Sequence, residues 1–231
     1  AQLIFDLTRK IGKEPVMCNK DIPGFIANGV MMFPLNFVGQ LIDQDKFKIE
    51  EIDSALHFNI GMRMAVFGLI DFVGIDVTYN ILKFMTTRIK GMTLAKCLED
   101  RVKRGDLGVK TGKGFYEYPT GRWTVPPSWS PSLAGKFDPQ FVTSVAINRA
   151  AALVDEEVAT PADIDKTLKL GFNLPLGMLE IADSLGIDTV IEKLEEIAKE
   201  YDPFYTPHAY LRKLVKDGKL GRKSGEGFFK Y

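Results

Sequence analysis

The chain has 231 residues, 45% of them hydrophobic and 26% charged, a balance that supports a folded core and excludes an intrinsically disordered polypeptide. Lysine plus arginine and aspartate plus glutamate both number 30, so the zero net charge gives no support for a nucleic-acid partner. No apolar run approaches the roughly 18 residues of a membrane-spanning helix, and two cysteines without paired spacing favour a reducing, cytoplasmic setting over a disulfide framework or a zinc site.

In chain order, the sequence predicts an almost entirely helical protein. The apolar stretch from Phe25 to Asp43 is the first long helix, and Pro34 is expected to kink or interrupt it. Residues 75–89 and 187–198 carry apolar side chains at helical spacing. No alternating strand pattern occurs.

Residues 160–163 have the pattern of a helix start. Thr160 is a suitable N-cap, Pro161 suits the first helical position, and Asp163 suits the first turn. Gly105 is expected at a helix end, where glycine can adopt a left-handed conformation.

The chain repeats itself at an offset of 112 residues. Residues 49–53 correspond to 161–165, and GLIDFVGID at 68–76 corresponds to residues 180–188. After one added residue, GVKTGKGFYEY at 108–118 corresponds to GRKSGEGFFKY at 221–231. Three blocks in nearly constant register predict a duplication.

The sequence predicts two tandem domains joined by a linker. Residues 1–119 form the first copy, 120–136 a proline-rich linker, and 137–231 the second copy. Trp123 and Trp129 in the linker predict that it is held against a surface rather than free in solvent.

Three motifs of the first copy are similar to the C-terminal helical domain of 3-hydroxyacyl-CoA dehydrogenases. They are DIPGFIAN at 21–28, similar to the family's D-x-P-G-F-x-x-N-R, the segment 51–76, and GVKTGKGFYEY at 108–118. The resemblance covers nearly all of residues 1–119, and residues 137–231 echo it. It implies an all-α fold of two pseudo-two-fold related domains, of the type shared with the C-terminal domain of 6-phosphogluconate dehydrogenase.

The resemblance implies a function in oxidising the 3-hydroxyl of a 3-hydroxyacyl-CoA with NAD, in fatty-acid β-oxidation or 3-hydroxybutyryl-CoA metabolism. In that family an N-terminal Rossmann domain binds NAD and carries the catalytic His–Glu pair, and the helical domain closes over the substrate and pairs subunits. The implied partners are a Rossmann domain, an enoyl-CoA hydratase domain in fused members, and the second repeat as an intrachain pseudo-dimer.

The motifs of this chain match only the helical part of that family. The glycines of GVKTGKG do not follow an apolar strand, so they are not a dinucleotide-binding loop. No histidine matches the catalytic base, so no catalytic residue is assigned and residues 1–231 alone are expected to be inactive.

Asn28 is the predicted substrate-binding residue. By resemblance, its carboxamide reaches the cleft and orients the substrate, with the competing interpretation of a helix-surface or capping residue. The family's arginine after this asparagine is Gly29 here, and the second repeat has Gln140 at the corresponding position. The second copy is therefore expected to serve structure.

Lys110 is the predicted cofactor-binding residue. By resemblance, it reaches the nicotinamide end of NAD, with the competing interpretation of a solvated lysine in a structural turn. Lys223 corresponds to it in the second copy.

The other polar candidates are interpreted as structural. Asp53, Asp71 and Asp76 recur in the second copy, so they are expected to cap helix ends rather than to catalyse. Neither His57 nor His208 has a partner at ligand spacing, so no metal site is predicted. The methionines at 31, 32, 62 and 64 are expected in the core or along a groove.

Two alternatives remain from the sequence. One is a non-catalytic helical assembly module, in which the side chain of Asn28 is covered rather than facing an open cleft. The other is a related dehydrogenase for a different hydroxy acid, against which the PGF and KTGKGFY motifs argue.

Overall fold

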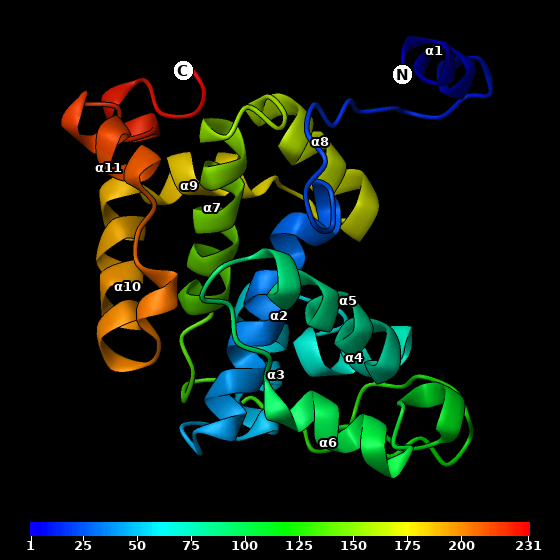
Figure 1. The fold of residues 1–231 in the computed structure, drawn as a ribbon. Coiled ribbons are helices and arrows are strands. Elements are labelled where there is room, and N and C mark those ends of the chain that lie inside the picture. Colours follow the sequence, from blue (N-terminus) through cyan, green and yellow to red (C-terminus); the bar gives the residue numbers. More distant parts are fainter. The chain divides into compact units, whose positions relative to one another are not determined.

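The computed structural model describes residues 1–231 and is all-helical, as predicted, without a β-strand (Figure 1). The first repeat contains the helices α1 (Gln2–Lys10), α2 (Ala27–Asp43), α3 (Ile49–Ile60), α4 (Val66–Val73), α5 (Ile75–Arg88) and α6 (Lys96–Arg104), and the 3-10 helix η1 (Val109–Thr111). The second repeat contains α7 (Gln140–Asp155), α8 (Pro161–Phe172), α9 (Met178–Leu185), α10 (Ile187–Glu200) and α11 (Ala209–Lys216), with η2 (Pro203–Tyr205) and η3 (Arg222–Ser224). Helices α2–α6 and η1 therefore correspond in order to α7–α11 and η3, whereas α1 and η2 have no counterpart.

The chain divides into two compact units that each combine segments of both repeats. Unit 1 contains residues 1–30, 146–198 and 205–231, and unit 2 contains residues 31–145 and 199–204. Unit 1 thus joins most of the second repeat to the N-terminal segment of the first. Unit 2 joins most of the first repeat to the linker and the start of α7.

Helix α2 continues through Pro34, so the expected interruption of the helix is wrong. Proline removes one backbone donor and favours a break in an exposed helix. Here residues 29–41 are all buried, so packing on every side of the helix opposes that break. Gly39 permits close packing, because a Cβ there would lie 2.7 Å from the Cβ of Ala95.

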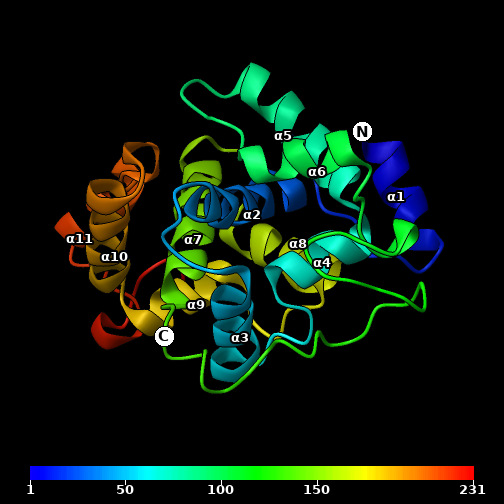
Figure 2. The same ribbon diagram turned by 90° about the horizontal axis from the view of Figure 1, so that it is seen from below.

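The predicted helix boundaries are confirmed. Helix α8 begins at Pro161, and the hydroxyl of Thr160 accepts the backbone N–H of Asp163 at 3.2 Å. Gly105 ends α6 in a left-handed conformation with φ +77°. Helices α10 and α11 lie side by side in both views and are linked by an ion pair between Arg212 and Glu195 (Figures 1 and 2).

The linker is held against unit 2, as its tryptophans predict. Trp129 is buried, and its indole N–H donates to the Tyr116 hydroxyl at 2.9 Å. The indole N–H of Trp123 donates to the carbonyl of Gly68 at 3.2 Å. None of the helices has the length and apolar character that crossing a bilayer requires.

Candidate functional site

Each repeat closes its C-terminal tail around a buried aspartate. In the first, Asp71 accepts the backbone N–H groups of Phe115 and Tyr116, both at 2.9 Å, and the Tyr118 hydroxyl at 3.0 Å. Burial raises the pKa of Asp71 to about 6, and the three donors partly offset that rise. The glycine-rich turn therefore directs its amides at a carboxylate of the same chain.

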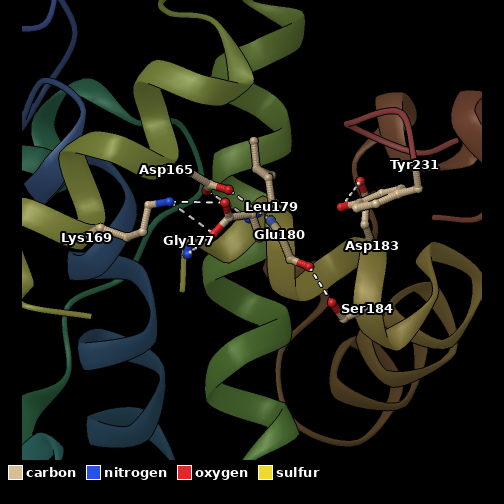
Figure 3. A network of polar contacts seen from close by, with 8 residues as sticks. All are labelled: Asp165, Lys169, Gly177, Leu179, Glu180, Asp183, Ser184 and Tyr231. Carbon is tan, nitrogen blue, oxygen red and sulfur yellow. Dashed lines mark hydrogen bonds and ion pairs between the residues drawn. The ribbon is translucent and has the colours of Figure 1, made fainter. Parts of the chain in front are cut away.

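The second repeat forms the same tail around Asp183. This aspartate accepts the N–H groups of Phe228 and Phe229, both at 2.9 Å. It also accepts the Tyr231 hydroxyl at 3.2 Å, as Figure 3 shows. A Cβ on Gly221 would lie 2.3 Å from the Asp183 carbonyl, as one on Gly108 would lie 2.2 Å from that of Asp71. These glycines serve the tail geometry of both repeats, which supports rejecting the turn as a dinucleotide-binding loop.

A second aspartate in each repeat caps a helix. Asp165 accepts the N–H groups of Leu179 and Glu180 at the start of α9, both at 2.9 Å (Figure 3). Asp53 does the same for Phe67 and Gly68 at the start of α4, both at 3.0 Å. The capping interpretation is confirmed for Asp53 and Asp165. It is wrong for Asp71, which holds the C-terminal tail instead of a helix end.

The two caps differ in one respect. Asp53 also accepts the Tyr116 hydroxyl at 3.0 Å, whereas Phe229 stands at the position corresponding to Tyr116 in the second repeat. Asp53 is fully buried, and burial raises its pKa to about 7. Burial also raises the pKa of Asp165, to about 6.

Asn28 lies in the first turn of α2, half-buried, on a groove of about 640 Å³ within unit 1. The groove is lined by Glu14, Val16, Cys18, Gly24, Phe25, Ile26, Ala27, Asn28, Thr167, Leu170 and Gly171. Its residues come from the segment before α2 in the first repeat and from α8 in the second. The carboxamide of Asn28 forms no hydrogen bond with another part of the chain, so its donor and acceptor are available to a ligand.

Lys110 lies in unit 2 and forms a close ion pair with Asp76. The pair lowers the pKa of Asp76, and the two side chains are 45% and 31% exposed. Lys223 pairs with Asp188 in the same way in the second repeat. This recurrence favours the structural-turn interpretation, and contact of Lys110 with NAD stays a prediction.

The groove contains residues that the sequence did not single out. Thr167, Leu170 and Gly171 belong to the repeat that was expected to serve structure alone. The sequence signal that pointed to the groove is the motif DIPGFIAN at 21–28, which contains both Phe25 and Asn28. None of the methionines considered for a groove lines it. The histidines do not form a metal site, since no group of three potential ligands lies together.

The family comparison matches most of the chain. The model described as "3-hydroxyacyl-CoA dehydrogenase, C-terminal domain" matches residues 24–118 and again residues 142–231. The two matches correspond to the two repeats.

Curated relatives match the chain over part of their length. A probable 3-hydroxybutyryl-CoA dehydrogenase from Deinococcus radiodurans is 48% identical over 86 residues, which is 37% of this chain and 31% of the relative. The fatty acid oxidation complex subunit alpha of Idiomarina loihiensis is 28% identical over 227 residues, which is 92% of this chain and 32% of the relative. The chain thus spans about a third of the length of these relatives.

A solved structure shares the fold of both repeats. The crystal structure of 3-hydroxybutyryl-CoA dehydrogenase from Escherichia coli matches with a TM-score of 0.78 at 20% identity, covering 94% of this chain and 65% of that one. At this identity the match establishes the fold of the chain.

Proposed function

We propose, from the premise that this chain belongs to the 3-hydroxyacyl-CoA dehydrogenase family and contains its C-terminal domain twice, that it forms the substrate-closing part of such an enzyme. The observation that carries the proposal is the position of Asn28, a lining residue of an open groove whose carboxamide has no hydrogen-bond partner in the chain. The assembly-module alternative requires that side chain to be covered. A helical part of a dehydrogenase acts together with a nucleotide-binding domain, and a fused hydratase domain is a further partner of this proposal.

NAD is assigned mainly to that nucleotide-binding domain. Residues 1–231 do not fit a dinucleotide cradle, because the amides after Gly114 are hydrogen-bonded to Asp71 rather than directed at open space. When bound, NAD would accept a hydride from the carbon that bears the substrate hydroxyl, while the hydroxyl itself gives up a proton. The contribution of this chain is to orient the substrate with Asn28, which can donate to and accept from uncharged oxygen groups without placing a charge in the cleft.

Replacing Asn28 by alanine is expected to lower kcat/KM about 100-fold. A substrate displaced by about 1 Å from its reactive position loses activity by about that factor. The measurement is NAD-linked oxidation of 3-hydroxybutyryl-CoA by the full-length gene product that contains residues 1–231. Gln140→Ala is the matched control at the corresponding position of the second repeat and is expected to retain wild-type kinetics. Residues 1–231 alone are expected to show no turnover.

Two results would contradict the proposal. One is a full-length product without NAD-linked turnover of any 3-hydroxyacyl-CoA. The other is an Asn28→Ala variant with the kinetics of the wild type. Ordinary turnover by residues 1–231 alone would show instead that the chain contains the chemistry that we assign to a partner domain.

Lys110→Ala is expected to raise the KM for NAD about 10-fold if the lysine reaches the cofactor, a loss of about 1.4 kcal/mol of binding. Lys223→Ala, which removes the same ion pair in the second repeat, is expected to leave that KM unchanged. Steady-state kinetics at varied NAD concentration give the KM for NAD of both variants, and the two values are compared. Equal effects of both would assign Lys110 to the turn alone.

A further inference from the structure

We propose that the groove of unit 1 binds the acyl chain of a 3-hydroxyacyl-CoA and that helix α8 of the second repeat forms one of its walls. This inference rests on the proposed function and assigns the second repeat a part in substrate binding. Leu170 and Phe25 are the two large apolar side chains that the groove leaves exposed, at 61% and 63%. Covering such side chains with an alkyl chain removes apolar surface from water.

The chemistry of the lining favours an alkyl chain over the nucleotide end of a CoA. Most of the lining is apolar, and the one charged side chain is that of Glu14. Glu14 forms an ion pair with Lys166 at 3.9 Å, and the lining itself contains no lysine or arginine that could bind the phosphates of a CoA. The volume of about 640 Å³ lies in the range of small-molecule sites.

The groove combines both repeats within one compact unit. Its first wall is the segment before α2, which is held by the backbone N–H of Asn19 donating to the carbonyl of Val158 at 2.8 Å. Its second wall is α8, where a Cβ on Gly171 would lie 3.9 Å from the Cβ of Ala27. The polar group of Asn28 and the apolar group of Leu170 therefore belong to the same groove, as a hydroxyacyl ligand requires.

The related segments of unit 2 provide an internal comparison. There the segment before α7 is fastened to α3, because the Ser130 N–H donates to the Ser54 hydroxyl at 3.0 Å and the Asn59 amide donates to the Ala134 carbonyl at 2.8 Å. Trp129 is buried in that segment, whereas Met17 at the corresponding position is only half-buried. In the second repeat, which lacks the asparagine, side chains of the protein therefore fill the space beside the segment before α7.

Phe25 shows the same difference at the level of the backbone. Its φ is +50°, a conformation that bulky residues rarely adopt and that clusters at functional sites. Phe137, its counterpart, has no positive φ, is 3% exposed and packs edge-on against Phe47. The strained, exposed phenylalanine occurs only where the groove is open.

The test is the chain-length profile of the full-length gene product with Leu170→Trp, which fills the groove from an exposed position. The quantity compared is the ratio of kcat/KM for 3-hydroxyoctanoyl-CoA to kcat/KM for 3-hydroxybutyryl-CoA. We expect this ratio to fall about 10-fold or more in the variant, since each methylene excluded from the groove removes a favourable burial. Phe58→Trp, at the corresponding position of α3, is the matched control and should leave the ratio of the two substrates unchanged.

The outcomes separate this inference from the proposed function. Leu170→Trp and wild type could have the same ratio of kcat/KM for the two substrates while Asn28→Ala is impaired on both. That result would overturn the assignment of the acyl chain to the groove of unit 1 and leave the proposed function standing. A ratio changed equally by Phe58→Trp would also overturn it. Activity on neither substrate in the wild type would overturn both.

Discussion

Replacement of Gly108 by alanine is expected to lower the melting temperature of the chain by about 10 °C or more. Gly108 has φ +93°, and a Cβ there would lie 2.2 Å from the carbonyl oxygen of Asp71. The neighbouring backbone is fixed, because Asp71 also accepts the N–H groups of Phe115 and Tyr116. With ψ −148°, this backbone conformation is one that essentially only glycine adopts and costs other residues about 1–3 kcal/mol. The backbone overlap brings the expected loss to about 4 kcal/mol. Thermal unfolding followed by circular dichroism measures it.

Two further glycine variants control this prediction. Gly221→Ala meets the same obstacle in the second repeat, since its Cβ would lie 2.3 Å from the Asp183 carbonyl, and it should be comparably unstable. Gly135→Ala meets no atom within 4 Å and is expected to melt within about 2 °C of wild type. If Gly108→Ala had the same melting temperature as Gly135→Ala, the tail of the first repeat would be able to move away from the added Cβ at little cost, and the prediction would be wrong.

The duplication and its aspartates could be predicted because their causes are local. Gly108 and Gly221 recur since no other residue tolerates their backbone conformation beside a carbonyl group. Asp53 and Asp165 recur since each caps the helix that follows the next turn. Each of these contacts joins two residues of the same repeat, so the same residue types occur at the same spacing in both repeats.

The composition of the compact units could not be predicted, because it depends on contacts between distant segments. The sequence orders the repeats as 1–119 and 137–231, whereas unit 1 joins residues 1–30 to the second repeat. The hydrogen bond between Asn19 and Val158 is of this kind, since neither residue type predicts it. For the same reason, the interruption expected at Pro34 does not occur, because burial of α2 on all sides is a tertiary property.

The candidate site was accessible to sequence reasoning in part. Asn28 was found through a motif, and the structure supports its availability. Leu170 was missed because it lies in the repeat without the asparagine and has no distinctive local pattern. Lys110 was found through a motif too, but its pairing with Asp76 required the fold, as these residues are 34 positions apart.

Replacing Asp53 by asparagine is expected to destabilise the chain by about 3 kcal/mol at pH 5. Three donors point at this buried carboxyl group, from Phe67, Gly68 and Tyr116, and an amide directs its own donors at one of them. The penalty should shrink as the pH rises to 7.5. Urea unfolding at several pH values measures it.

The direction of this pH dependence follows from the raised pKa of Asp53. The unfolded group ionises near 3.8 and the folded group near 7, so the contribution to stability is full below pH 3.8 and is lost as the pH rises to about 7. Each proton of difference changes the free energy of unfolding by about 1.4 kcal/mol per pH unit, and asparagine removes that contribution. Asp76→Asn is the control: its pKa is lowered by Lys110, so it should shift stability by at most about 1 kcal/mol, equally from pH 5 to 7.5. An Asp53→Asn penalty that stays constant over this range would mean that the buried carboxyl remains charged, held by its three donors.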